Sequence, residues 1–277
     1  MKLCDAHSHY HFPALGSFGS ELWTTARTAG LSAAVVNGTC ESDWGAVAEF
    51  VENHPWCRAA YGIHPWLAPH RSAHWESALH ARLHADPGAS VGEIGLDAWV
   101  EGNDPADQIQ LMRRQWDVAG EHARPVTVHC VRAWEPLRKL LKSIGPYPTG
   151  FLLHAYSGPP EWIAWLVEKG AWFSFSPYFL LDRKRPQREA FRQIPRDRVL
   201  IETDAPELSP PPESNPFPLM EAGSGRVLNH PANIRTALAA LAAVLELSEA
   251  EVAHQTARNW EHLFGTCSPG PLRSGPV

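Results

Sequence analysis

The feature that most constrains the fold is a regular alternation of short apolar runs with longer amphipathic stretches along the chain. Strands that alternate with helices pair in parallel, with each helix crossing back over the sheet. About eight such units predict a closed (β/α)8 barrel, a TIM barrel built as a single domain. The expected strands are Lys2–His7, Ser32–Val36, Ala59–Gly62, Ser90–Ile94, Pro125–His129, Gly150–His154, Ala171–Phe175 and Val199–Ile201.

The amphipathic stretches between these runs have the spacing of helices that bury one face. Two more helices follow the last strand, and Ser248 is placed to cap the second of them. An open, doubly wound sheet is the structural alternative, but no glycine-rich GxGxxG turn supports it. The expected helices are Glu21–Ala29, Asp43–Asn53, Trp75–Ala85, Asp107–Glu121, Glu135–Lys142, Glu161–Glu168, Arg188–Gln193, Asn233–Leu245 and Glu249–Phe264.

The length of 277 residues suits one such barrel, which typically takes about 250 residues. We expect residues 1–265 to form the barrel domain and residues 266–277, rich in proline, glycine and serine, to form a disordered tail. The proline-rich stretch Pro206–Pro218 predicts a long loop after the last strand.

The net charge of −6, with histidine counted neutral, excludes a strongly basic nucleic-acid binder. Any affinity for nucleic acid must then come from a local patch or from bound cations. Five scattered cysteines without a CxxC pair suggest thiols in a reducing compartment. The N-terminus has no apolar stretch long enough for a signal peptide or a membrane span, so a cytoplasmic location without membrane contact is expected.

Histidine and carboxylate side chains recur where the predicted strands end. In barrels of this kind the carboxyl ends of the strands carry the active site. His7 and His9 are two apart in an extended segment and therefore share one face, where both can reach one cation. The full set is His7, His9, Glu93, His129, His154 and Asp204.

Each of these residues alone has an ordinary explanation. The histidine pair can be solvated, Glu93 can be neutralised by an arginine, and His129 or His154 can be a hydrogen-bonded core residue. A buried carboxylate is costly without a cationic partner, and Glu93 ends an apolar run. Six such groups at strand exits are best explained together, as a site for divalent metal ions.

The types of ligand narrow the choice of metal. Mixed imidazole and carboxylate ligands favour Zn²⁺ or Mn²⁺, and Mg²⁺ is a weaker alternative because it prefers oxygen ligands. No cysteine is in the set, which disfavours a structural zinc site.

The segments DAHSH, GIHPW, GEIGLD, VHC, LLHAYSG and ETDAP, followed by the closing NWEHLFG, resemble the TatD family of hydrolases in the amidohydrolase superfamily. The resemblance implies one metal held by His7, His9, Glu93 and Asp204. It implies a second metal held by Glu93, His129 and His154, with Glu93 bridging the two. It further implies a phosphoesterase or deoxyribonuclease, often acting from the 3′ end of DNA, with His64 contacting the substrate phosphate.

Two divalent cations can activate a water and clamp the phosphoryl oxygens of a nucleic acid or a small phosphoester. We expect Asp204 to be the catalytic base and His64 a second catalytic residue, which could protonate the leaving group. No obligate protein partner is evident. The expected substrate contacts are His64, Arg132, Tyr156 and Ser157.

Three departures from the family pattern leave the substrate open. Tyr10 and His11 stand where the family usually has Leu-Asp, Arg132 comes later than the family's arginine, and His230 replaces a glutamate. His11 is either a pocket residue or a solvent-facing histidine. Nucleic acid could also meet the basic turn 183–185 or stack on Trp66, Trp99 and Tyr178, although the turn can equally be an ordinary solvated one.

Other functions remain as alternatives on the same barrel. An amidohydrolase or lactonase would often bridge its metals with a carboxylated lysine, but Ala89–Asp97 contains none. An aminoacyl-tRNA deacylase stays possible. An inactive metal-binding protein is disfavoured by the intact ligand set.

Overall fold

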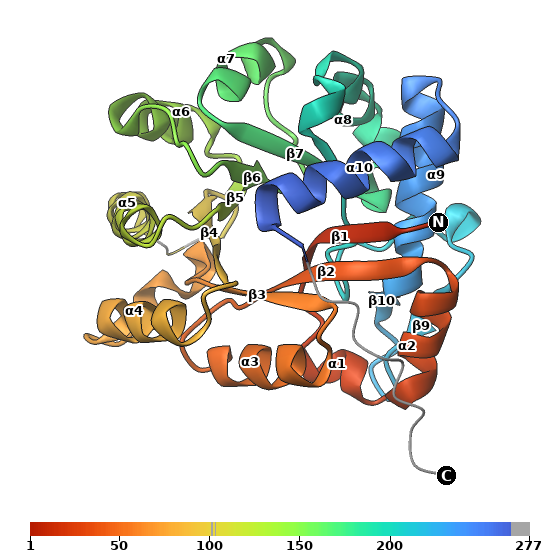
Figure 1. Ribbon diagram of the computed structural model, residues 1–277, viewed down its shortest axis with the longest axis horizontal. Helices are drawn as coiled ribbons and strands as arrows, with labels where there is room; N and C mark the ends of the chain where they lie inside the picture. Colours follow the sequence, from red (N-terminus) through yellow and green to blue (C-terminus); the bar gives the residue numbers. More distant parts are fainter. Residues whose placement is uncertain (101, 103, 267–277) are drawn as a thin grey trace.

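The computed structural model describes residues 1–100, 102 and 104–266. In this part of the chain, eight parallel strands close into a barrel in sequence order, with β1 paired to β8 (Figure 1). The predicted (β/α)8 TIM barrel is confirmed. The strands are β1 (Leu3–Ser8), β2 (Leu31–Asn37), β3 (Cys57–Tyr61), β4 (Ser90–Asp97), β5 (Val126–Val131), β6 (Phe151–Leu153), β7 (Ala171–Phe175) and β8 (Val199–Ile201).

An outer layer of helices surrounds the barrel (Figure 1). No described helix is long and apolar enough to cross a membrane. The helices are α1 (Pro13–Gly16), α2 (Gly19–Thr28), α3 (Trp44–Asn53), α4 (Trp75–Ala85), α5 (Pro105–Glu121), α6 (Trp134–Ile144), α7 (Ile163–Glu168), α8 (Arg185–Ala190), α9 (Ile234–Leu245) and α10 (Glu249–Phe264).

The predicted elements are present, and most bounds differ by a few residues. The sequence analysis missed the single turn of α1 and a small antiparallel hairpin, β9 (Pro218–Met220) with β10 (Val227–Asn229). Strands of three residues are too short to show an alternating pattern, and β9 begins with a proline. The expected loop 206–218 precedes the hairpin and includes a 3-10 turn at Pro212–Ser214. Of the predicted tail 266–277, residues 267–277 lie outside the described residues.

The last helix packs against the barrel interior. Side chains of six strands form one buried cluster with Ala257, Trp260, Leu263 and Phe264 of α10. Side chains from so many strands can meet only inside the closed barrel. The predicted cap of α10 is present, because the Ser248 hydroxyl accepts from the Glu251 backbone N–H and the Glu251 carboxylate accepts from the Ser248 N–H.

The interior becomes polar towards the carboxyl ends of the strands. Trp172 and Leu200 belong to the apolar cluster, and Ser174 and Glu202 lie two residues further along each segment. Residues two apart in a strand face the same side, so Ser174 and Glu202 occupy the next layer. The Ser174 hydroxyl donates to the fully buried Glu202 carboxylate. Helix α10 therefore covers the apolar end of the barrel interior, and the polar residues lie towards the carboxyl ends of the strands.

Gly95 in β4 has a conformation that only glycine adopts without strain. Its φ is +153°, and a Cβ placed there would clash with the carbonyl oxygen of His129 on β5. We expect Gly95→Ala to lower the free energy of unfolding by at least about 2 kcal/mol. Urea denaturation followed by circular dichroism measures it. Gly120→Ala on α5, where the nearest atom would be 3.9 Å away, is the control and should be neutral or slightly stabilising.

Candidate metal centre

The six residues predicted as metal ligands come together at the carboxyl end of the barrel. His7, Glu93 and His129 lie in β1, β4 and β5. His9 and His154 directly follow β1 and β6, and Asp204 lies three residues after the end of β8. All except the half-buried His129 are buried. The pairing of β1 with β2 is irregular between Asp5 and Ser8, at the position of His7. Strand ends from across the chain thus bring one set of imidazoles and carboxylates into contact.

The Glu93 carboxylate lies at the middle of the set and presents a different oxygen to each side. Its Oε2 lies 3.3 Å from Nε2 of His7 and 3.3 Å from Nε2 of His9. Its Oε1 lies 2.9 Å from Nδ1 of His129 and 2.9 Å from Nε2 of His154. Those two ring nitrogens are themselves 3.3 Å apart. Each oxygen of this one carboxylate therefore faces a different pair of ring nitrogens.

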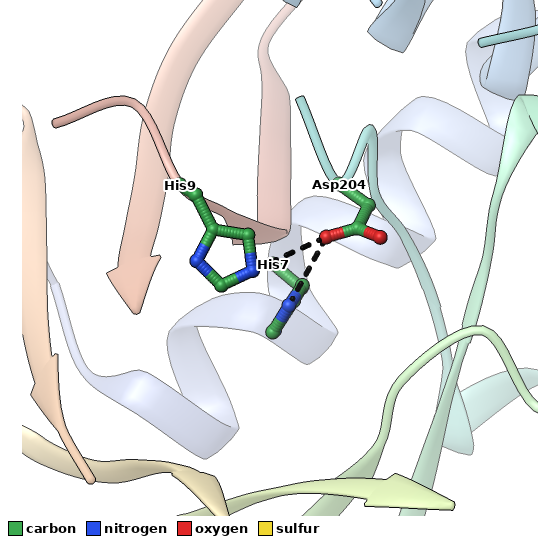
Figure 2. Close-up of side chains that lie close together, drawn as sticks. All are labelled: His7, His9 and Asp204. Atoms are coloured by element: carbon green, nitrogen blue, oxygen red, sulfur yellow. Dashed lines mark ion pairs between the residues drawn. The ribbon is translucent and has the colours of Figure 1, made fainter. Parts of the chain in front are cut away.

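Asp204 completes the group on the Oε2 side. Its Oδ1 lies 3.3 Å from Nε2 of His7 and 3.4 Å from Nε2 of His9, and Figure 2 shows both rings turned towards this oxygen. The Asp204 backbone has φ of +59° and donates its N–H to the His7 carbonyl at 3.0 Å. This left-handed residue turns the chain after β8 so that the carboxylate meets β1.

The buried cluster requires positive charge. Burial alone would raise the pKa of the Glu93 carboxyl, but the surrounding imidazoles, His154 and His7 first, hold that pKa well below its usual range. Burial alone would likewise lower the pKa of His9, yet its contacts with Asp204 and Glu93 raise the pKa to about 10. Two buried carboxylates kept ionised in this way need cations beside them.

The donor set fits divalent metal ions. Neither ring nitrogen of the fully buried His7 makes a hydrogen bond within the described residues. Three overlapping groups each place three ligand atoms within 4.8 Å of one another, which is the spacing that a shared ion needs: His7, His9 and Asp204; His7, Glu93 and His154; His64, Glu93 and His129.

Comparison with known proteins identifies the family. Residues 4–265 match the family described as TatD related DNase. The chain belongs to this family. The 3′-5′ ssDNA/RNA exonuclease TatD of Erwinia tasmaniensis is 30% identical over 243 residues, covering 86% of this chain and 90% of that protein. The uncharacterized metal-dependent hydrolase YabD of Bacillus subtilis is 27% identical over 266 residues, covering 95% and 98%.

Solved structures agree on the architecture of the TatD family. The crystal structure of YJJV, a TatD homologue from Escherichia coli K12, superposes with a TM-score of 0.86 at 24% identity. The superposition covers 95% of this chain and 98% of the YJJV chain, which shows a shared fold. The expected resemblance is confirmed, and the chain is a metal-dependent hydrolase of the TatD family.

Outer contacts hold the imidazoles of this TatD-family centre in place. Nδ1 of His9 lies 2.8 Å from the Asn37 carbonyl oxygen, and Nε2 of His129 lies 2.8 Å from Oδ2 of Asp97. Histidines that bind metals usually donate their second N–H to such an oxygen. No role was predicted for Asp97, because a sequence does not show which side chain of β5 lies beside a given residue of β4.

His64 lies beside the centre, slightly further from Glu93 than the four predicted histidine ligands. Its Nε2 is 3.7 Å from Oε1 of Glu93, and its Nδ1 accepts the Trp66 backbone N–H at 3.2 Å. Burial, together with the imidazole of His129 beside it, lowers the pKa of His64 to about 3. The geometry therefore allows His64 to contact either a metal or a substrate held by it.

The three other expected substrate contacts are placed differently. Tyr156 is fully buried and its hydroxyl donates to the Pro159 carbonyl at 2.8 Å, which disfavours the predicted contact of this side chain with substrate. Its ring packs on Trp134 and Phe173 instead. Arg132 is exposed, and Ser157 is half-buried. Their contact with substrate stays a prediction.

Two departures from the TatD family pattern lie inside the protein. The side chain of His11 is 2% exposed, and its Nε2 lies 3.4 Å from Oδ2 of Asp43. His11 is therefore not a solvent-facing histidine. The Nδ1 of the buried His230 accepts the Ala232 backbone N–H at 2.9 Å. Burial lowers its pKa to about 4, which favours a neutral ring.

The basic turn at residues 183–185 contacts the nearby side chain of Tyr178. The Arg183 guanidinium and the Lys184 ammonium lie 5.4 and 5.2 Å from the centre of the Tyr178 ring, and Arg183 also donates to the Tyr178 hydroxyl. Contact of this turn with nucleic acid stays a prediction.

Proposed function

We propose that this chain is an exonuclease that uses two divalent metal ions, Zn²⁺ or Mn²⁺, to remove nucleotides from the 3′ end of single-stranded DNA or RNA. The Erwinia relative carries this activity in its name and spans most of the chain. The observation that carries the proposal is the position of Glu93, whose two oxygens face two groups of histidines. A carboxylate so placed is suited to bridge a pair of cations.

In this proposal the first ion is held by Glu93, His7, His9 and Asp204, and the second by Glu93, His129 and His154. When bound, the two ions would supply Lewis acidity for the attacking water and for the phosphoryl oxygens. The imidazoles and carboxylates fix where the scissile phosphate lies, and the buried walls exclude other water from it.

Asp204 takes the proton from the attacking water. Its Oδ1 faces the two imidazoles, whereas Figure 2 shows the other carboxylate oxygen directed away from both rings. One oxygen can therefore bind a cation while the second accepts a proton, as a general base must. Its position after the last strand places it at the open end of the barrel.

The substrate assay that tests this function uses oligonucleotides labelled at either end, as single-stranded DNA, duplex DNA and RNA, each with Zn²⁺, Mn²⁺ or Mg²⁺. We expect single nucleotides to be released from the 3′ end of the single strands. Release only from a lactone or an amide substrate in the same panel would contradict the proposal. No lysine lies in β4, where Glu93 takes the bridging place, and this disfavours such relatives.

His64 binds the substrate phosphate in this account and is not a metal ligand. A hydrogen bond to a charged group contributes about 1.5–3 kcal/mol, so His64→Ala should lower kcat/KM on oligonucleotides by about 10- to 100-fold. Elemental analysis should find the metal content unchanged. Loss of metal from the variant would make His64 a ligand and contradict this division of roles.

A further inference from the structure

Two exposed indole rings stand beside the metal centre. Trp66 and Trp99 are 49% and 59% exposed, whereas each of the other tryptophans is buried or half-buried. The Trp66 ring lies edge-to-face with the rings of His64 and His129, at centroid distances of 5.0 and 6.3 Å. Large aromatic side chains left in solvent next to a catalytic centre are typical of a binding surface.

Asp97 accepts a hydrogen bond from each of the two tryptophans. Its Oδ2 accepts from Nε1 of Trp66 at 2.7 Å, and its Oδ1 accepts the Trp99 backbone N–H at 2.6 Å. The same Oδ2 lies 2.8 Å from Nε2 of His129. One carboxylate thus links His129 of the metal centre to the indole of Trp66 and to the backbone of Trp99.

Arg132 adds a positive charge to this surface. Its guanidinium lies 3.8 Å from the centre of the Trp99 ring, in the geometry of a cation–π contact. No carboxylate pairs with the exposed Arg132 among the described residues. A guanidinium in this position can bind a phosphate, because none of its N–H groups is taken up by an ion pair with a described residue.

We propose that Trp66, Trp99 and Arg132 form a stacking subsite for the unpaired bases of the strand whose phosphate lies at the metals, an inference that rests on the proposed function. Aromatic rings stack on any base and so bind without sequence preference, and arginine contacts the backbone. Bases within a duplex cover each other's faces and cannot stack on such rings. The subsite therefore selects single strands.

The test compares an oligothymidylate with the same strand carrying abasic residues at its 3′ end. Stacking contributes about 1–3 kcal/mol per base, so Trp99→Ala should raise KM on the normal strand by roughly 5- to 150-fold with little change in kcat. The abasic strand should lose nothing further in this variant. Trp99→Phe should restore most of the affinity, because a ring is present again.

Trp66→Phe is the second variant, because it keeps an aromatic ring at this position but removes the indole N–H that donates to Asp97. Trp162→Ala is the matched control, because Arg138 lies 4.9 Å from the Trp162 ring in a similar pair. It should leave both strands unaffected. An equal loss on normal and abasic strands would overturn the stacking role, as would an unchanged KM in Trp99→Ala. A wild-type protein that cleaves neither strand would overturn the proposed function itself.

Discussion

Glu93→Gln is expected to lose most of its metal and to fall in activity by at least about 10³-fold. The neutral amide keeps the shape but presents one oxygen and one NH2 group, so it cannot offer an anionic oxygen to each pair of histidines. Metal ions contribute several kcal/mol to the stabilisation of a transition state of this kind, and about 4 kcal/mol corresponds to that factor. Elemental analysis of the purified variant, alongside an oligonucleotide assay, measures both effects.

The control for this variant is Glu135→Gln, which changes an exposed carboxylate on α6 that pairs with Arg138. It should retain the wild-type metal content and activity. Full metal retention in Glu93→Gln would refute the bridging role, even if its activity were low.

Asp204→Asn is expected to lower kcat by about 10²–10⁴-fold, with a modest change in KM and in metal content. The amide oxygen can still coordinate an ion through the position that Oδ1 holds, but the side chain can no longer accept a proton. Loss of a general base typically costs a factor of this size. Steady-state kinetics on a labelled oligonucleotide, paired with metal analysis of the same preparation, separates proton transfer from metal binding.

Asp107→Asn, which changes a carboxylate that pairs with Arg71 and is not in the ligand set, provides the comparison for Asp204→Asn. It should be as active as the wild type. Near wild-type turnover of Asp204→Asn would show that the attacking water needs no base from the protein, and Asp204 would then be a ligand only.

Much of the fold and of the metal centre could be predicted from the sequence, because parallel strands bring their carboxyl ends together. The alternation of strands and helices therefore predicted the barrel, and the residue types at the strand ends predicted the metal ligands. The last barrel strand does not extend as far as its ligand, because β8 ends at Ile201 and Asp204 turns the chain with a positive φ. Glu202 nevertheless lies deeper, fully buried beside Ser174.

Contacts between distant segments could not be predicted in this way. The bond between Asp97 and His129 depends on the register of β4 and β5, which no local pattern encodes. The burial of Tyr156 depends on the packing of Trp134 and Phe173 around it. A motif shows which residue types stand at a strand exit, but not whether the next aromatic turns inward to the core.

The proposed mechanism depends on a pair of ions that share Glu93, and anomalous diffraction from crystals grown with Mn²⁺ shows whether both bind. We expect two anomalous peaks, one at each oxygen of Glu93. One peak should lie within reach of His7, His9 and Asp204, and the other within reach of His129 and His154. A single peak, or two peaks that do not share Glu93, would contradict it.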